Sequence, residues 1–390
     1  MVVSFRTSST AVLFVILLVL PSACPWAAEA DIAPPPKLGA KAHILIDLNN
    51  LQVLTQYNPD RRLPPASLTK LMTAYTVFQE LRAGRIGIDS EVRISRRAWR
   101  MGGSKMFINK GTDVLVEELL KGLIIQSGND AAVALAEFVA GSVESFADLM
   151  NLYAQNLGLD DSHFINPTGL PARDHYSSAR DLAHLTAALI ENFPEYYSYF
   201  SELEFSYRPP GESPITQPNR NKLLKWDPSV DGVKTGFTAS AGYCLVASSR
   251  REDMRLISVV LGTETAKQRF KNSQSLLNWG FDSFESRRMY VAGRSLGQVR
   301  VWKGNQDRVD LGALQDIEVT VPRGRIDQLS IDTEINAEPV APVGKNRILG
   351  KVTVTFEGEV LLERPLVSLE GVAQGSLWRR VVDAVLLWAQ

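Results

Sequence analysis

Three short motifs in this chain carry the residue types that serine acyl transfer requires. They follow one another as Ser67-Leu-Thr-Lys70, Ser127-Gly-Asn129 and Lys234-Thr-Gly236. A Ser-x-x-Lys pattern alone is weak evidence, because about one chance match is expected in a chain of this size. Each of the three patterns occurs once here, and together they supply a nucleophile, a base and an anchor for a carboxylate. Their combination predicts a serine acyl-transfer site.

The first motif places a hydroxyl and an amine three residues apart at the expected start of a helix. Side chains at i and i+3 share one helix face, so Ser67 and Lys70 can meet. The helix N-terminus also favours negative charge developing near Ser67. A serine needs a base, and Lys70 serves only when neutral, which a second cation such as Lys234 would promote. The alternative is a helix-capping serine beside a solvated lysine.

The second motif lies in a turn between two expected helices. Ser127 is a candidate to relay a proton to the leaving group. The Asn129 amide is a candidate to hold substrate and to orient Lys70. The same residue types are common in ordinary helix-capping turns, so this motif carries weight only together with the other two.

The third motif sets a cation beside a hydroxyl at the head of an expected strand. Lys234 and Thr235 suit a substrate carboxylate, and Gly236 lets a substrate backbone approach closely. Arg269 is a candidate second carboxylate contact, although most single arginines on helices are merely solvated. Lys-Thr-Gly is also compatible with a plain turn. Residues 102–106 are expected to form a flexible loop that borders the cleft.

Hydrophobic periodicity predicts the elements that must position these motifs. A hairpin is expected around Asn49-Asn50. The expected strands are 42–48, 52–56, 242–249 and 255–262, with a further one at Val233, and the expected helices are 68–81, 114–125, 130–139, 178–191 and 266–280. Strand-rich ends around a helical middle predict an α/β or α+β domain over residues 31–285.

Beyond about residue 284 the pattern changes to short alternating segments with Gly and Pro between them. Such a pattern is typical of strands. We therefore expect a separate small β domain over residues 286–370, with a role as a stalk or an interaction module.

Composition bounds the possible functions. The chain has 390 residues, a net charge of -1 and a hydrophobic content of 45%, which is long enough for two globular domains. Near-zero charge argues against nucleic acid as a partner. The four histidines are scattered, so neither a metal site nor another cofactor is expected. Cys244 lies in a strand-like run and is expected to be buried and inert.

Residues 1–30 are expected to be a secretory signal peptide. Arg6 precedes an apolar run over 11–20, and Ala28-Glu-Ala30 offers small residues for cleavage. The alternative is a retained membrane helix, for which the run is short. Cys24 would mark a lipoprotein site, but Pro21 stands where such a site favours Leu.

Residues 375–390 are expected to form an amphipathic helix. From Leu377 onward, Arg379, Arg380 and Asp383 gather on one side, and Trp378, Val381, Val382, Val385 and Trp388 cover the other. The segment is too short and too charged to span a bilayer, but it suits a position in the membrane interface. The alternative is a helix docked on its own domain.

The three motifs, taken in this order, resemble those of the penicillin-recognising serine enzymes. The chain is most similar to D-alanyl-D-alanine carboxypeptidases, the low-molecular-mass penicillin-binding proteins of the penicillin-binding protein 5 type. The similarity covers roughly residues 38–285, and more loosely the β domain and terminal helix. Flanking residues that support it are Pro65-Ala-Ser-Leu-Thr-Lys-Leu-Met-Thr73, Gly103-Ser-Lys-Met-Phe107, Asn166-Pro-Thr-Gly-Leu170, Thr216-Gln-Pro-Asn-Arg-Asn221 and Ala241-Gly-Tyr-Cys-Leu-Val-Ala247.

The resemblance implies a β-lactamase/transpeptidase-like α/β (α+β) domain, with an antiparallel sheet and helices on both sides. It implies that Ser67 attacks the bond between two terminal D-alanines of a peptidoglycan stem peptide, with neutral Lys70 as base and the backbone N–H groups of Ser67 and Phe237 as oxyanion hole. β-Lactam antibiotics would acylate Ser67 in the same way. It also implies an exported protein on the periplasmic face of the bacterial inner membrane, held there by its C-terminal helix.

Two features depart from the family. Phe237 follows Lys-Thr-Gly where relatives often carry a histidine, which predicts an altered substrate preference or pH profile. The terminal helix has few basic residues, which predicts weak attraction to anionic lipid.

The alternatives are a class A-like β-lactamase, for which no Glu-x-x-Leu-Asn segment is found, and a non-catalytic cell-wall binding or shape protein. Endopeptidase cleavage would use the same residues.

Overall fold

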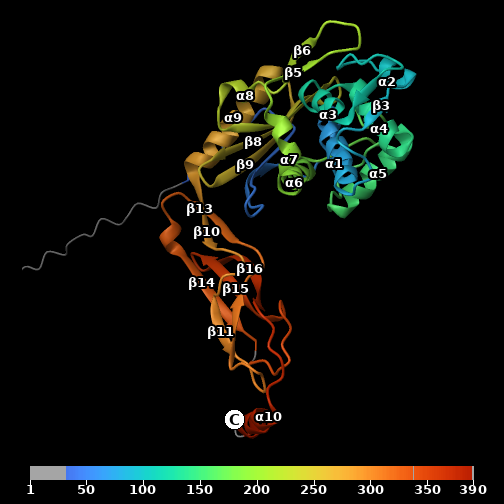
Figure 1. Ribbon diagram of the computed structural model, residues 1–390. Coiled ribbons are helices and arrows are strands. Elements are labelled where there is room, and N and C mark those ends of the chain that lie inside the picture. The colour runs from blue at the N-terminus through green and yellow to red at the C-terminus, as the bar shows by residue number, and fades with distance from the viewer. Residues whose placement is uncertain (1–31, 337, 389–390) are drawn as a thin grey trace, which may run out of the picture. The chain divides into compact units, whose positions relative to one another are not determined.

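The computed structural model describes residues 32–336 and 338–388. Residues 42–263 contribute a five-stranded sheet in the order β2-β1-β9-β8-β7 (Figure 1). All four neighbouring pairs run antiparallel, as expected. The strands are β1 (Ala42–Asp47), β2 (Val53–Tyr57), β7 (Val230–Thr238), β8 (Gly242–Arg251) and β9 (Met254–Thr263).

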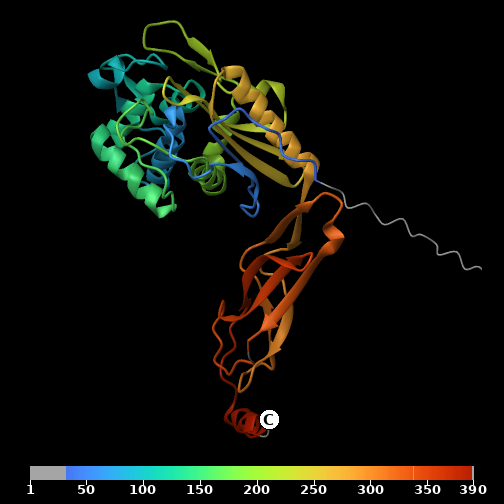
Figure 2. The same cartoon turned by 180° about the vertical axis from the view of Figure 1, so that it is seen from behind.

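Helices cover both faces of this sheet, which the view from behind also shows (Figure 2). Along β1, Leu45 points to the side of α9 (Ala266–Ser283), and Ile44 and Ile46 point to the opposite, larger core. This alternation is the period-two pattern of a strand buried on both sides. The larger core also contains α1 (Thr69–Arg82) and α6 (Ala179–Asn192).

The predicted helices form within a few residues of their expected bounds, because local capping signals set their starts. The Ser178 hydroxyl accepts the N–H of Asp181 at the start of α6, and Thr265 and Gln268 form a capping box at the start of α9. The remaining long helices are α3 (Val116–Ile125), α4 (Asn129–Ala140) and α5 (Val143–Asn156), and the short ones are α2 (Arg96–Arg100), α7 (Pro194–Tyr197), α8 (Leu223–Trp226) and the 3-10 helices Ala66–Leu68, Ser198–Ser201 and Ile326–Gln328.

One helix, α5, was not predicted, although Ser142 caps it. Two expectations need correction. Residues 114–115 belong to strand β4 and not to the following helix. The Lys-Thr-Gly motif lies inside β7 and does not head it. Two two-stranded antiparallel sheets complete the domain. One pairs β3 (Glu91–Arg93) with β4 (Asp113–Leu115), and the other pairs β5 (Glu204–Tyr207) with β6 (Ile215–Pro218).

Residues 284–368 are built from strands. β10 (Phe284–Tyr290) pairs with β13 (Ile317–Pro322). A second sheet has the order β11-β12-β16-β15-β14. Its strands are β11 (Gly297–Arg300), β12 (Arg308–Gly312), β14 (Leu329–Ile335), β15 (Ile348–Phe356) and β16 (Glu359–Ser368). Buried side chains of these strands form two small apolar cores, and Asp47 at the end of β1 accepts a 2.6 Å hydrogen bond from Thr320 of β13.

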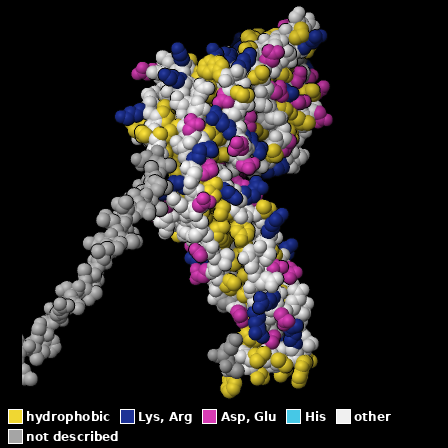
Figure 3. Space-filling view, turned by 90° about the vertical axis from the view of Figure 1, so that its left-hand side faces the viewer, with side chains coloured by type: hydrophobic (Ala, Val, Ile, Leu, Met, Phe, Trp, Pro, Cys, Tyr) yellow, Lys and Arg dark blue, Asp and Glu magenta, His cyan; other side chains and the backbone are white. Residues whose placement is uncertain are grey.

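The last described element is helix α10 (Leu377–Trp388). Asp383 on its polar side is buried, and the opposite, apolar side is exposed. Hydrophobic side chains gather on this helix in the space-filling view (Figure 3). Among residues 32–336 and 338–388, no helix is both long and apolar enough to cross a membrane. The expected signal peptide and Cys24 lie outside the described residues, and Cys244 is buried as predicted.

Candidate active site

Ser67 and Lys70 meet as their spacing predicts. Ser67 belongs to the 3-10 helix Ala66–Leu68, which runs directly into α1, and Lys70 lies in the first turn of α1. The Lys70 ammonium donates to the Ser67 hydroxyl over 3.3 Å. This distance lets a neutral amine take the hydroxyl proton with little movement.

Two further oxygens fix the Lys70 amine. It donates to Asn129 Oδ1 over 2.7 Å and to the carbonyl of Thr168 over 2.7 Å. The side chain is 1% exposed. Burial lowers the pKa of Lys70 to about 7, and the negative charge of Asp130 opposes this shift. Near neutral pH a large fraction of Lys70 is therefore available as a base.

Burial is the main cause of this low pKa. From the sequence we expected the charge of Lys234 to contribute, and electrostatic repulsion between the two lysines is present. Burial also lowers the pKa of Lys234 well below its ordinary value. Repulsion from nearby cations adds to the shift at Lys234; these cations are Lys70, Arg269 and Arg220. The two lysines are thus close enough to interact electrostatically, as expected.

The Ser127-Gly-Asn129 motif forms the turn between α3 and α4. Ser127 has a positive φ of 63°, which is uncommon for a residue with a side chain. Its hydroxyl is buried and has no hydrogen-bond partner among the described residues. Asn129 starts α4, and its Nδ2 donates to the carbonyl of Gly102 over 2.7 Å. Asn129 thereby joins the Lys70 amine to the loop at 102–106, and Ser127 keeps a free hydroxyl in the same turn.

The Lys-Thr-Gly motif lies on β7 against the 3-10 helix that carries Ser67. Lys234 and Thr235 are buried. A Cβ atom at Gly236 would lie 3.0 Å from the carbonyl oxygen of Pro65 and 3.3 Å from the Ala66 Cβ. Glycine at this position therefore lets β7 pack closely beside the nucleophile segment.

Arg269 reaches the same strand from α9. It donates to the carbonyl of Gly236 over 3.1 Å, and burial lowers its pKa. The next residue of β7, Phe237, is 52% exposed and stacks on Tyr243 at 4.2 Å between ring centroids. The guanidinium of Arg269 lies 5.6 Å from the same Tyr243 ring. An exposed aromatic pair therefore stands beside the positively charged end of the motif.

Residues 166–170 form a loop of the site for which the sequence predicted no role. The Asn166 side chain accepts from the N–H groups of Thr168 and Gly169 and so shapes this loop. Thr73 of α1 donates to the carbonyl of Pro167 over 2.7 Å. These contacts aim the Thr168 carbonyl at the Lys70 amine.

His175 also belongs to the site, although the sequence predicted no role for it. Its Nδ1 accepts the N–H of Ile165 over 3.0 Å, so the ring proton is on Nε2, which lies 2.8 Å from the Thr69 hydroxyl. Burial lowers the pKa of His175 to about 4, so the ring is neutral at physiological pH. It joins the loop to the first turn of α1.

Asp130 and Arg220 are two further residues of the site that were not predicted from the sequence. The Asp130 carboxylate accepts the N–H groups of Met106 and Phe107, each over 2.9 Å, and so holds the loop that borders the site. Arg220 contributes positive charge near Lys234. Asp130 directly follows the Ser127-Gly-Asn129 motif, and Arg220 lies in the segment 216–221 that supports the family resemblance, so this proximity was the available signal.

A hollow of about 390 Å³ adjoins the nucleophile segment. Its lining includes Pro65 and Ala66 on one side, Gly169 and Leu170 on another, and Thr238 at the end of β7. In the part of the chain that the structure describes, no cluster of His, Cys, Asp and Glu side chains is arranged to hold a metal ion.

Taken together, the arrangement suits acyl transfer to a serine. A hydroxyl, a base with a pKa of about 7 and a second free hydroxyl lie on adjoining elements, beside the buried Lys234 and the partly buried Arg269. Buried cations attract a carboxylate strongly. The site therefore fits an acyl donor with a negatively charged end.

Comparison with known proteins gives two family matches. Residues 29–265 match the peptidase S11 family, described as D-alanyl-D-alanine carboxypeptidase, and residues 284–374 match the penicillin-binding protein 5 C-terminal domain. The chain is 42% identical over 361 residues to D-alanyl-D-alanine carboxypeptidase DacA of Escherichia coli (strain K12), covering 90% of this chain and 88% of the relative.

Two solved structures illustrate the similarity. Penicillin-binding protein 5 from Haemophilus influenzae superposes with a TM-score of 0.82 and 41% identity, covering 88% of this chain and 100% of that one. Penicillin-binding protein D2 from Listeria monocytogenes, in its ampicillin-bound form, has a TM-score of 0.58 and 30% identity, and covers 64% of this chain and 100% of that one.

Proposed function

The chain belongs to the D-alanyl-D-alanine carboxypeptidase family of serine peptidases, and we propose that Ser67, Lys70 and Ser127 carry out its chemistry. The protein is a serine-type D-alanyl-D-alanine carboxypeptidase and a low-molecular-mass penicillin-binding protein. One observation carries the residue assignment: the Ser67 hydroxyl lies 3.3 Å from a lysine amine whose pKa is about 7.

In the proposed acylation step, neutral Lys70 takes the Ser67 proton while the Ser67 oxygen attacks the carbonyl carbon between the two terminal D-alanines of a peptidoglycan stem peptide. The backbone N–H groups of Ser67 and Phe237 stabilise the resulting oxyanion. As the C–N bond breaks, Ser127 passes a proton to the amine of the departing D-alanine. Its unpartnered hydroxyl, held by a positive φ, supports this role.

The terminal carboxylate is proposed to bind to Lys234, Thr235 and Arg269. Lys234 is buried and Arg269 is partly buried, which strengthens the attraction of these two cations, since water screens them little. The peptide backbone is proposed to lie along β7, and Asn129 is proposed to hold the substrate amide while it orients Lys70. Water then hydrolyses the ester and restores Ser67. No cofactor takes part in these steps.

β-Lactams acylate the same serine in this proposal. Their strained amide takes the place of the scissile peptide bond, and their carboxylate takes the place of the terminal D-alanine carboxylate. The relative from Listeria monocytogenes, whose structure is described in an ampicillin-bound form, supports β-lactam binding by this fold. Membership of the carboxypeptidase family favours this function over a class A-like β-lactamase or a non-catalytic cell-wall protein.

The test is covalent labelling of the purified protein with a fluorescent penicillin, together with release of D-alanine from a pentapeptide ending in D-Ala-D-Ala. Ser67→Ala is expected to abolish both signals. Ser198→Ala removes an exposed hydroxyl elsewhere and is the matched control, expected to retain both. Labelling that persists in Ser67→Ala would contradict the assignment of the nucleophile.

We also propose that residues 1–30 direct export and that α10 attaches the protein to the periplasmic face of the inner membrane. The apolar side of α10 supports this, because Trp378 is 77%, Val385 is 62% and Trp388 is 90% exposed. Contiguous exposed apolar surface of this kind marks interaction sites with membranes or other proteins. A helix that lies in the interface accounts for the exposed face without crossing the bilayer.

A further inference from the structure

Helix α10 is held by its polar side. The Asp383 carboxylate accepts the backbone N–H of Lys303 over 2.6 Å and is 9% exposed. Arg379 forms an ion pair with Asp307, a residue of the β domain. The Gly375 N–H donates to the Lys303 carbonyl over 2.9 Å just before the helix. These contacts fix the rotation of α10 about its own axis, with its apolar side away from the strands.

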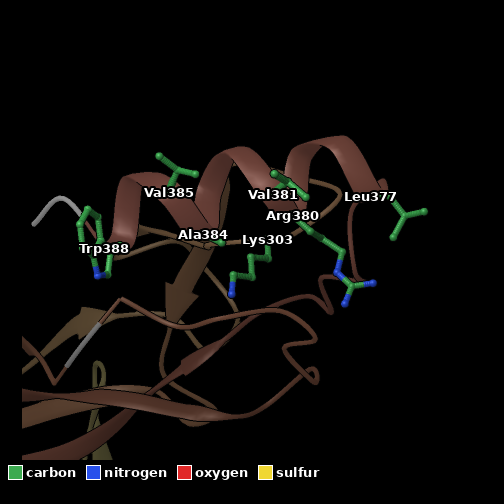
Figure 4. A pocket seen from close by; sticks show the side chains of 7 residues that line it. All are labelled: Lys303, Leu377, Arg380, Val381, Ala384, Val385 and Trp388. Atoms are coloured by element: carbon green, nitrogen blue, oxygen red, sulfur yellow. The ribbon is translucent and has the colours of Figure 1, made fainter.

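A hollow of about 570 Å³ lies alongside this helix, next to Lys303 (Figure 4). Most of its lining is apolar and comes from one side of α10. Two of the lining residues are cationic. The lining residues are Lys303, Leu377, Arg380, Val381, Ala384, Val385 and Trp388.

The two cations differ from their neighbour Arg379. Arg379 is neutralised by Asp307, whereas the described residues provide no ion pair for the side chains of Lys303 and Arg380. Asp383 on the same helix accepts the backbone N–H of Lys303 and does not line the hollow. Two unneutralised cations therefore border an exposed apolar surface.

This combination matches one class of ligand. An anionic phospholipid joins a phosphate to acyl chains, so its head needs cations and its tails need apolar contacts. A guanidinium binds phosphate through parallel N–H donors, and an ammonium adds a point charge. Tryptophan favours the level of the headgroups. A free phosphate would leave the apolar lining unused.

We propose that Lys303 and Arg380 together bind the headgroup phosphate of an anionic phospholipid, while Trp388 lies at the level of the headgroups and Val381 and Val385 contact the acyl chains. This inference rests on the proposed attachment of α10 to the membrane and specifies the lipid. It also replaces the expectation that the helix attracts anionic lipid weakly, because Lys303 comes from the β domain and doubles the number of cations available at the hollow.

The experiment measures binding of the full chain to phosphatidylcholine vesicles with and without phosphatidylglycerol. For the wild type, phosphatidylglycerol is expected to strengthen binding. Lys303→Gln and Arg380→Gln are each expected to weaken binding to these anionic vesicles about fivefold, since one basic residue near an anionic surface contributes about that factor. Binding to pure phosphatidylcholine is expected to stay unchanged.

The double variant Lys303→Gln, Arg380→Gln distinguishes two cases: both cations bind one phosphate, or each cation is attracted independently to the anionic surface. If both cations bind one phosphate, the double variant binds little more weakly than either single variant. Independent losses that multiply to about 25-fold would overturn the shared site. Lys345→Gln, an exposed cation of the same domain outside the hollow, is the matched control and is expected to lose less than the pocket variants. An equal loss in the control would also overturn the proposal.

Two further outcomes distinguish a failure of the proposed lipid site from a failure of the proposed membrane attachment. A wild type that binds neither kind of vesicle would contradict membrane attachment itself. Equal binding of wild type and variants to both kinds would contradict only the lipid site. Inorganic phosphate is the remaining probe, and at constant ionic strength it is expected not to displace the protein from vesicles. Displacement that Lys303→Gln abolishes would identify free phosphate as the ligand and overturn the lipid assignment.

Discussion

Lys70 acts in this site through its burial. An exposed lysine is protonated at neutral pH, but loss of solvation here lowers the pKa of Lys70 to about 7. The same burial leaves its hydrogen bonds to Asn129 and Thr168 undisturbed by water. A base with a pKa near the working pH gives the best balance between being deprotonated and being basic.

This pKa predicts how acylation depends on pH. The neutral, active fraction of Lys70 rises as pH increases through 7, so the acylation rate is expected to rise about tenfold from pH 6 to pH 8. Stopped-flow labelling with a fluorescent penicillin measures that rate directly. A flat profile over this range would contradict Lys70 as the base.

Phe237 offers a second prediction at the scale of one residue. Its ring is exposed and stacked on Tyr243, whereas its proposed catalytic contribution is its backbone N–H. Phe237→His keeps that N–H and is expected to retain penicillin labelling within about threefold, but to add an ionisation near the ordinary histidine pKa of about 6.5. The pH profiles of the two proteins test this. Identical profiles would show that the side chain at this position does not influence the reaction.

At the scale of elements, the loop at 166–170 must pack tightly on α1 to place the Thr168 carbonyl. Gly169 has a φ of +79°, and a Cβ atom there would lie 1.8 Å from the carbonyl oxygen of Ala66. Gly169→Ala is therefore expected to displace the loop, to lower the melting temperature and to slow acylation. Thermal unfolding and penicillin labelling measure the two effects.

Gly158→Ala is the matched control for that change. Gly158 has a similar φ of +68°, but nothing lies within 4 Å of a Cβ atom there. It is expected to lose about 1 kcal/mol from backbone strain alone and to acylate normally. If Gly169→Ala behaves like this control, the close packing of the loop is not required for catalysis.

His175 predicts how stability depends on pH, because it joins the same loop to α1. Its pKa is about 4 in the folded protein and about 6.5 in an unfolded chain. Between these values the unfolded chain binds more protons, so the free energy of unfolding falls as pH decreases from 6.5 to 4. His175→Gln removes this ionisation and is expected to reduce the fall in melting temperature over that range. An unchanged slope would mean that other groups dominate.

At the scale of the whole molecule, catalysis and membrane attachment are expected to be separable. Val381 and Val385 are 57% and 62% exposed on α10, so glutamates there disturb no packed core. The double variant Val381→Glu, Val385→Glu is expected to keep full penicillin labelling and to lose vesicle binding, since charges partition poorly into lipid. Co-sedimentation with vesicles measures the loss.

Val360→Glu makes the same chemical change at an exposed position of β16, away from α10. It is expected to bind vesicles like the wild type. Equal loss of binding in this control and in the α10 variant would point to a general effect of negative charge and not to the helix.

The sequence by itself determined the order of the three motifs, the meeting of Ser67 with Lys70, most strands and helices of the first domain, and the two-sided character of the terminal helix. These features depend on short-range geometry, since i and i+3 neighbours, capping residues and alternating strands are fixed within a few residues. Helix α5 was missed even so, although it has its own capping serine.

Only the tertiary structure decided the features that depend on packing between distant segments. Burial is the main cause of the lowered pKa of Lys70. His175 and the Thr168 carbonyl reach α1 from a loop far along the chain, and Lys303 meets α10 from the β domain. The physical reason is that desolvation and hydrogen bonding depend on what surrounds a group in space, and that is fixed only when remote parts of the chain come together.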